Sequence, residues 1–430
     1  MIESVIFFFS GSGMVMLFIL FMRINVVGSK SKLVKHRSKE PGFVDLLIYA
    51  SVVDEGVIVG KDGSLMAAWA YQGVDSNSST EAERDQVSLQ INHALSRMGS
   101  GWMIHIDAVR KPAPGYSAKD DSHFPDPVSA AIDEERREFF ERVGTLYESN
   151  YVITATYLPP LLAQQKFVEL MFDDEGVPVD SKTRTIALLN HFKRECANIE
   201  SHLSSVFRMK RLKGKTITKE DNSSVNYDAF LRWIQFCISG LDHPVILPKN
   251  PIYLDALLSG QEFWGGVVPK IGQNFIQVVS IEGFPLASSP GLINSLADLP
   301  CLYRWSTRFI FMDTHEAVGH LEKFSKKWKQ KIRSFFDQVF NSHSSNVDQN
   351  AINMVSDAQA AIAETNSGEV AQGYYTSVVV LMSESRGDLE ASARQVAKAI
   401  NHLGFTARIE TINTIDAYLG SLPGHGVENV

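Results

Sequence analysis

Cysteine is scarce in this 430-residue sequence, which contains three, at Cys196, Cys237 and Cys301. They are far apart and odd in number, and none has the C-x-x-C spacing of a metal knuckle or a redox motif. The pattern excludes a disulfide framework. It predicts reduced thiols in a cytosolic compartment.

Basic residues are in deficit beyond the first 39 positions. Residues 1–39 carry a net charge of +5 and the remainder −13, which gives the formal net charge of −8. Nucleic-acid binding needs a basic face that neutralises phosphates. The acidic body therefore argues against a general nucleic-acid surface, and we expect no sequence-specific nucleic-acid partner.

A phosphate-binding loop of the form G-x-x-x-x-G-K-[ST] is absent from the sequence. Gly214-Lys215-Thr216 has the required ending, but Met209 occupies the position of the first glycine. Gly60-Lys61 is followed by Asp62, an anion where a hydroxyl should bind Mg²⁺. We expect no nucleotide cofactor and no catalytic residue in this chain.

The sequence also gives little support for a metal site or a hydrolase site. His105-x-Asp107 lies in a predicted strand, so both side chains should face one side, and Asp313-x-His315 opens a predicted helix. Two ligands do not make a metal site, and neither pair has an evident third. We predict structural roles for both pairs, and turn capping for the loop residues Asp120, Asp121 and His123.

One hydrophobic run stands out. Val5–Met22 contains 18 residues without charge, which as a helix would be about 27 Å long and would just span a bilayer. The basic residues that follow should hold the rest of the chain in the cytoplasm, with the N-terminus periplasmic, and could contact anionic lipid or a partner. These residues are Arg23, Lys30, Lys32, Lys35, Arg37 and Lys39. A cleaved signal peptide and a peripheral segment buried against a partner remain alternatives.

The rest of the sequence predicts an α+β fold with two lobes around a helical middle. Each lobe shows strand, strand, helix, strand, helix, strand, and could be ferredoxin-like. Examples are an Asp-Gly hairpin at 61–63, a capping box at Thr80 and Glu83, and a cap at Asp313 before a long helix. The predicted divisions are an anchor at 1–27, a basic linker at 28–42, a first lobe at 43–160, a helical segment at 161–262 and a second lobe at 263–430.

Two basic clusters allow more than one interpretation. Residues 208–219 form a polar loop that is either simply solvated or in contact with lipid, DNA or a partner. The outer face of the helix near 323–333 is rich in lysine, which is ordinary for an exposed face opposite an apolar one.

Several segments together resemble the TrbE branch of the TrbE/VirB/CagE family of type IV secretion (conjugal transfer) ATPases. They span from about residue 43 to the last residue, in order. They read KDGSLMAAWAYQG (61–73), SGWMIHIDAVR (100–110), HFPDPVSAAIDEERREFF (123–140), PIYLDALLSGQEF (251–263), LYRWSTRFIFMD (302–313), KKWKQKIRSFFDQVF (326–340) and AYLGSLPG (417–424).

The resemblance implies an inner-membrane-associated protein that serves a conjugative channel, with inner-membrane channel components as partners and hexamers as an oligomeric form. In the family, AYLGSLPG precedes a RecA-like motor, so ATP and Mg²⁺ are expected only for that domain. The expected function is thus the membrane-docking and oligomerisation portion of such an ATPase, without its motor. A truncated product without independent activity, or an ATP-binding protein with a non-standard site, are the alternatives.

Overall fold

The computed structural model describes residues 42–73, 78–159, 179–218, 224–248, 252–285, 289, 291–339 and 349–426. The chain divides into two compact units, Met1–Leu47 and Ile48–Val430. In the first unit the described residues include a short helix, α2 (Phe43–Leu46). The predicted anchor at 1–27 and the six basic residues after it lie outside the described residues. Among the helices that are described, none has the length and apolar character of a membrane span.

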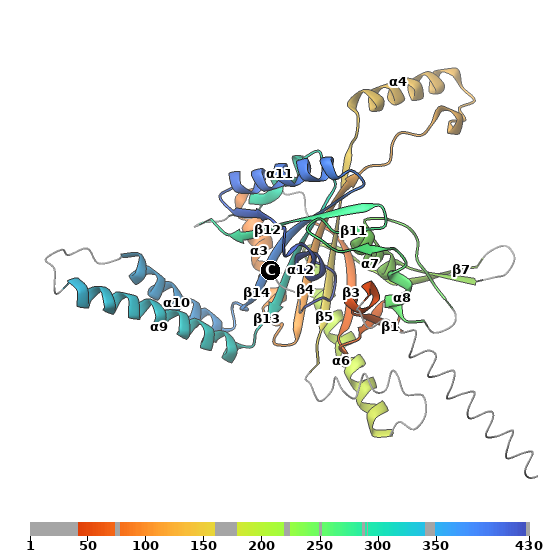
Figure 1. The fold of residues 1–430 in the computed structure, drawn as a ribbon. Coiled ribbons are helices and arrows are strands. Elements are labelled where there is room, and N and C mark those ends of the chain that lie inside the picture. Colours follow the sequence, from red (N-terminus) through yellow and green to blue (C-terminus); the bar gives the residue numbers. More distant parts are fainter. Residues whose placement is uncertain are drawn as a thin grey trace, which may run out of the picture. The chain divides into compact units, whose positions relative to one another are not determined.

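One large, almost wholly antiparallel sheet dominates the second unit. In the described chain its strand order is β1-β2-β3-β5-β4-β13-β14-β12-β11-β10, with β6 also paired to β3 and β15 to β12 (Figure 1). The strands are β1 (Tyr49–Asp54), β2 (Val57–Gly60), β3 (Leu65–Gln72), β4 (Trp102–Pro112), β5 (Tyr147–Tyr157), β6 (Arg208–Arg211), β10 (Phe263–Trp264), β11 (Lys270–Ile271), β12 (Asn274–Gly283), β13 (Tyr303–Phe311), β14 (Gly373–Ser383) and β15 (Thr406–Ile409). The predicted α+β class is confirmed.

The two halves of this sheet repeat one arrangement. The first half follows β3, α3 (Glu81–Leu95), β4, β5, α6 (Val179–Leu203) and β6, and its strands lie in the order β6-β3-β5-β4. The second half follows β12, the 3-10 helix η2 (Leu292–Asp298), β13, β14, α11 (Arg386–His402) and β15, in the order β15-β12-β14-β13. Strands β4 and β13 pair and join the halves, so the two predicted lobes share one sheet and one compact unit.

Helices cover one face of both halves. Trp69 and Phe192 are fully buried between the first half and helices α3 and α6. Val379 and Ala393 lie in the equivalent core beneath α11. Odd-numbered residues of β13 enter both cores, because alternate residues of a strand face the same side. Each large apolar side chain buried in this way contributes roughly 1.5–3 kcal/mol.

The predicted helix starts are confirmed. The Thr80 hydroxyl accepts a hydrogen bond from the Glu83 amide, and the Glu83 carboxylate accepts one from the Thr80 amide at 2.8 Å, which is a capping box. The Asp313 carboxylate accepts a hydrogen bond from the Glu316 amide at 2.7 Å at the start of α9 (Thr314–Val339). Both interactions satisfy amides that have no partner inside their own helix.

The opposite face of the sheet receives shorter elements. They are α7 (Ala229–Ser239), α8 (Leu254–Leu258) and α12 (Thr414–Gly420). The Asp228 carboxylate caps α7 by accepting hydrogen bonds from the amides of Phe230 and Leu231. The Tyr418 hydroxyl donates to the Ile238 carbonyl at 2.7 Å and ties α12 to the end of α7.

The middle of the chain departs from the sequence-based prediction. A polar loop between two helices was expected, but most of its described residues form strands. Strand β6 extends the large sheet, while β7 (Gly214–Thr218), β8 (Ser224–Asp228) and β9 (Ile246–Leu247) make a separate three-stranded sheet. The prediction was wrong because β6, β7 and β8 are mostly polar and lack an apolar alternation, and β9 has only two residues. Pairing with β3 orders Arg211, whose guanidinium lies 4.4 Å from the Trp69 ring centroid.

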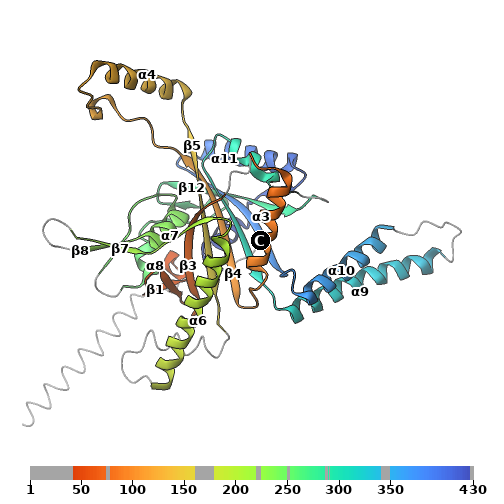
Figure 2. The ribbon, with the colours of Figure 1, turned by 180° about the vertical axis from the view of Figure 1, so that it is seen from behind.

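Helical arms interrupt both halves at the same point. The segment between β4 and β5 contains the 3-10 helix η1 (Lys119–Asp121) and helix α4 (Pro127–Val143). The segment between β13 and β14 contains α9 and α10 (Gln349–Ser367), which pack against each other. In both views these arms stand clear of the sheet (Figures 1 and 2).

Candidate functional site

The paired strands β4 and β13 form a polar centre in the sheet. Their register places Asp107 opposite Ser306 and His105 opposite Arg308. These side chains, together with Arg304, point away from the helix-covered face, and each is at most 4% exposed. The prediction that His105 and Asp107 share one side of a strand is confirmed. Buried polar groups at this density need partners, since each unpaired one costs about 1–3 kcal/mol.

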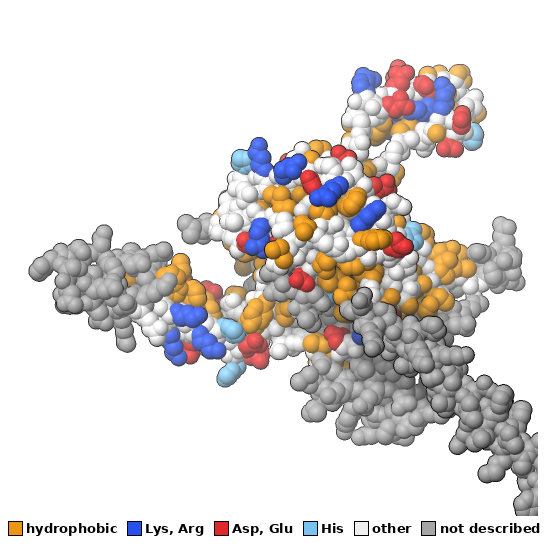
Figure 3. All heavy atoms as spheres, in the orientation of Figure 1, with side chains coloured by type: hydrophobic (Ala, Val, Ile, Leu, Met, Phe, Trp, Pro, Cys, Tyr) orange, Lys and Arg blue, Asp and Glu red, His pale blue; other side chains and the backbone are white. Residues whose placement is uncertain are grey.

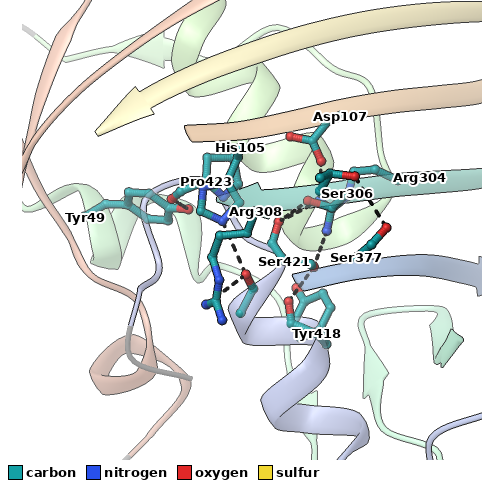
Figure 4. Close-up of polar contacts among 12 residues, drawn as sticks. Tyr49, His105, Asp107, Arg304, Ser306, Arg308, Ser377, Tyr418, Ser421 and Pro423 are labelled. Atoms are coloured by element: carbon teal, nitrogen blue, oxygen red, sulfur yellow. Dashed lines mark hydrogen bonds and ion pairs between the residues drawn. The ribbon is translucent and has the colours of Figure 1, made fainter. Parts of the chain in front are cut away.

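The partners come from residues 414–426, which we call the 414–426 segment. Arg304 Nη1 donates to the Ser421 carbonyl at 2.8 Å, and Arg304 Nη2 donates to Ser421 Oγ at 2.7 Å. Arg308 Nη1 donates to the His425 carbonyl at 3.1 Å. Figure 4 shows these side chains converging on the segment from the sheet.

Further hydrogen bonds extend this contact on both sides. The Tyr49 hydroxyl donates to the Pro423 carbonyl at 2.8 Å, and Ser306 Oγ donates to the Ser421 carbonyl at 3.2 Å. Most of the atoms that accept these hydrogen bonds are backbone carbonyl oxygens at the end of α12 and just beyond it. A helix end leaves such carbonyls unpaired, and here side chains from the sheet satisfy them.

Electrostatics strengthen the site. Arg304 Nη1 lies 2.8 Å from Asp107 Oδ1, and their side chains are 5% and 0% exposed. Burial raises the pKa of Asp107, and the neighbouring Arg304 guanidinium opposes that rise. Removing one member of such a buried pair leaves the other charge buried without a partner, which typically lowers the unfolding free energy by about 3–5 kcal/mol.

His105 is held neutral in the same site. Burial, together with the positive charge of Arg308, lowers the pKa of His105 to about 3. Its Nε2 lies 3.3 Å from the Gly420 carbonyl, so a neutral ring with the proton on Nε2 donates to that oxygen. His105 therefore acts as a hydrogen-bond donor and not as a base near neutral pH.

Glycine is required at one position of the segment. Gly424 has φ +85°, and a Cβ there would collide with the Met66 sulfur. The residues Leu422, Pro423 and Gly424 thus lie tightly on the sheet, with Leu422 fully buried. The polar side chains of the site therefore hold the backbone of the 414–426 segment in one conformation, and their hydrogen bonds are used for that purpose.

The two glycine-lysine sequences have ordinary structural surroundings. Gly214, Lys215 and Thr216 lie in β7 and pair with β8, so their backbone belongs to a strand ladder. Lys61, in the turn between β2 and β3, lies with its Nζ 2.6 Å from Asp255 Oδ2. The Asp62 carboxylate accepts from the Ser64 amide at 3.0 Å and closes the same turn.

The other residues considered from the sequence do not come together. Asp120 and Asp121 lie in η1, and His123 lies in the loop before α4. Within the described ranges, no three His, Cys, Asp or Glu side chains are grouped as a metal site. The three cysteines are free and buried, and burial raises the pKa of Cys196 to about 11.

The most important residues of the site were not recognised from the sequence. Arg304, Ser306 and Arg308 occupy alternate positions of β13, whose other residues are apolar or aromatic except for Thr307. Polar residues with a period of two inside a central strand would have been a usable signal, because such a strand is covered on both faces. The sequence could not show that Ser421 covers them.

Comparisons with known proteins agree with this architecture. Residues 56–165 match the family described as "Type IV secretion system ATPase VirB4/TrbE, N-terminal domain". Residues 215–427 match "CagE, TrbE, VirB family, component of type IV transporter system". The second match includes β13 and the whole 414–426 segment.

Individual relatives carry conjugation names. "Conjugal transfer protein TrbE" of Rhizobium radiobacter is 43% identical over 397 residues, which are 92% of this chain and 48% of that protein. A probable conjugal transfer protein TrbE of Sinorhizobium fredii (strain NBRC 101917 / NGR234) is split into two pieces. Its second piece is 42% identical over 240 residues, 56% of this chain and 36% of that piece. Its first piece is 49% identical over 125 residues, 29% of this chain and 84% of that piece.

The chain spans about half the length of the Rhizobium relative, at 48%. The resemblance deduced from the sequence motifs is thereby confirmed. The chain belongs to the TrbE branch of the CagE/TrbE/VirB family of type IV secretion and conjugal transfer ATPases.

Proposed function

We propose that this chain is the membrane-docking and self-associating portion of a conjugal transfer ATPase. The supporting observation is the match of 92% of the chain to a conjugal transfer protein, including a match to the N-terminal domain of that family. In this proposal the chain contains no nucleotide-binding motor of its own. It works with inner-membrane components of a type IV secretion channel, and its copies form hexamers.

The membrane contact is assigned to the start of the chain. Residues 1–27 form the anchor, with the N-terminus in the periplasm and the body in the cytoplasm of a bacterial inner membrane. The basic residues from Arg23 to Lys39 then lie next to anionic headgroups, where each contributes about 1 kcal/mol. The length of the uncharged run and the positive charges after it support this assignment.

We also propose that the halves of the sheet are two ferredoxin-like lobes that hold the 414–426 segment between them. Their shared β-α-β-β-α-β order supports this comparison. From the family resemblance we expect the motor of such ATPases to follow this segment. Because buried hydrogen bonds fix the segment on the sheet, the segment would hold that motor in one orientation relative to the sheet.

Membrane fractionation tests the anchor. The full chain should sediment with bacterial inner membranes after a wash at high salt, whereas a variant without residues 1–27 should appear in the soluble fraction. A variant with Lys30, Lys32 and Lys35 changed to Gln serves as the matched control. It should stay in the membrane but lose some of its binding to vesicles with anionic lipid. Unchanged membrane retention without residues 1–27 would refute the anchor.

Nucleotide titration tests the absence of a motor in this chain. The purified chain should show no saturable binding of ATP with Mg²⁺, and Lys215→Ala should make no difference. Saturable micromolar binding that Lys215→Ala abolishes would instead support the alternative of a non-standard ATP site near 210–216.

A further inference from the structure

The arms inserted into the two halves differ in charge and carry unpartnered helix faces. One arm is residues 113–146, with α4, between β4 and β5. The other is the pair α9 and α10 between β13 and β14. The arms are inserted at equivalent points of the two halves. A difference in charge or exposure between them therefore comes from their side chains and not from their position in the fold.

One face of α4 is packed within its own arm. The Tyr116 hydroxyl donates to Asp133 Oδ1 at 2.7 Å, and the Tyr116 and Phe140 rings stack with centroids 5.2 Å apart. Arg137 Nη2 donates to Asp133 Oδ2 at 2.6 Å. These contacts fix the orientation of the helix and leave its other face outward.

That outward face is apolar along its length. Val128, Ile132, Phe139 and Val143 are 65%, 55%, 56% and 47% exposed. Their spacings of four, seven and four place them on one stripe of a helix. A shallow hollow of about 680 Å³ lies along this stripe and is lined in part by Ile132, Glu138 and Phe139. A stripe of this kind on a soluble surface usually receives a partner.

The charge of the α4 arm points to the chemistry of that partner. Between Lys119 and Arg142 there are eight acidic and four basic residues. Glu135 and Glu138 line the same hollow and are exposed. Arg136 and Arg142 also line it, so the excess of acid belongs to the arm as a whole. An excess of acid disfavours anionic lipid and nucleic acid as occupants and favours a basic protein surface.

The second arm presents such a surface. The described side chains of α9, from Thr314 to Gln330, include four lysines and two glutamates. Lys323, Lys326, Lys327 and Lys329 are exposed. Phe324, beside Lys323, is 45% exposed. Figure 3 shows this cluster of basic side chains on α9, and acidic, basic and hydrophobic side chains interleaved on α4.

We propose that the outward face of α4 in one copy of the chain docks onto the lysine face of α9 in a neighbouring copy. Glu135 and Glu138 then meet Lys323 and Lys327, and Phe324 enters the hollow between Ile132 and Phe139. Each copy contributes two different surfaces, so the contact is heterologous, the type that generates closed rings when the rotation closes. This interface rests on the self-association in the proposed function and gives it a location.

Charge exchange tests the interface. Variant one is Glu135→Lys with Glu138→Lys, and variant two is Lys323→Glu with Lys327→Glu. In either variant alone, residues 135 and 138 carry the same charge as residues 323 and 327, so the dissociation constant from sedimentation velocity should rise at least about tenfold over the unmodified chain. An equimolar mixture should associate again, because residues 135 and 138 of each variant then meet oppositely charged residues 323 and 327 of the other.

The control is Glu262→Lys with Glu384→Lys, which changes the net charge as variant one does at exposed sites outside both arms. It should associate like the unmodified chain. The interface is wrong if the unmodified chain stays monomeric, if either variant associates normally, if the control also dissociates, or if the mixture fails to recover. Membrane fractionation of variants one and two should be unchanged, so failure here is distinguishable from failure of the anchor.

Discussion

The first half of the sheet brings His105 and Asp107 to the central strand pair, whereas the second half brings Arg304, Ser306 and Arg308. The two halves share a strand order, yet at the line where they meet one supplies an acid and a neutral donor and the other supplies cations. The difference therefore allows two similar halves to join through a buried ion pair and to bind a third element, the 414–426 segment.

The arms show the same divergence on the surface. The arm of the first half is acidic with an apolar stripe, and the described portion of α9 in the second half is basic. At the central strand pair and in the arms, the repeated fold determines where the side chains lie. The side chains themselves determine what binds there.

Breaking the central ion pair should have the largest effect. Arg304→Met removes both hydrogen bonds to Ser421 and leaves the Asp107 carboxylate buried without its cation, so the unfolding free energy should fall by about 3–5 kcal/mol. Urea denaturation followed by circular dichroism measures it. The double variant Arg304→Met with Asp107→Leu should recover much of the loss, since no charge is then stranded. An equal loss in both variants would contradict the stranded-charge explanation.

Acid should weaken the site through His105. The folded pKa of about 3 lies below the usual value of 6.5, so below pH 6.5 the unfolded chain binds a proton that the folded chain excludes. The stability from this group is complete above pH 6.5 and is lost as the pH falls toward 3, by about 1.4 kcal/mol per unit. His105→Gln keeps a donor for Gly420 and should be less sensitive to acid. Parallel stability curves for the variant and the unmodified chain between pH 7 and 4.5 would rule this out.

Ser421→Ala should lower the unfolding free energy moderately, because it weakens the contact between the second half and the 414–426 segment. It removes the acceptor of Arg304 Nη2 and the donor to the Tyr418 carbonyl at 2.6 Å. A loss of about 1–2 kcal/mol is expected. Ser96→Ala, at a half-buried serine at the end of α3, removes only a solvent-exposed hydrogen bond; it is the matched control and should change the unfolding free energy by less than about 0.5 kcal/mol.

Tyr49→Phe should be the mildest change. It removes one buried hydrogen bond, to the Pro423 carbonyl, and keeps the ring, which lies edge-on to His425 with centroids 5.7 Å apart. The expected loss is about 1 kcal/mol in thermal or urea unfolding. A loss as large as that of Arg304→Met would mean that the first half carries more of the contact than the hydrogen bonds indicate.

Local patterns allowed much of the fold to be predicted from the sequence. The hairpin at 61–63, the caps at Thr80 and Asp313 and the amphipathic helices depend on neighbouring residues, and all appear in the structure. Strands β6 to β8 were missed because polar strands lack periodicity and depend on distant pairing partners, and β9 is only two residues long. The joining of the halves through β4 and β13 is likewise a long-range contact without a local signal.

The site was predictable only to a limited extent. His105 and Asp107 were recognised as a pair on one strand face with a structural role. Their partners Arg304 and Ser421 are 197 and 117 residues away from Asp107 and Arg304 respectively, so no spacing rule connects them. The lysines and arginines from Arg23 to Lys39 lie outside the described residues, and their lipid contacts stay a prediction.

Hydrogen exchange of the 414–426 segment tests the central claim, that buried polar side chains of the sheet hold this segment. In the double variant Arg304→Met with Asp107→Leu, two hydrogen bonds to Ser421 are lost while both strands keep their pairing. Amides of the segment should exchange about ten to thirty times faster than in the unmodified chain, with β4 and β13 unchanged. Unchanged protection of the segment would contradict the account.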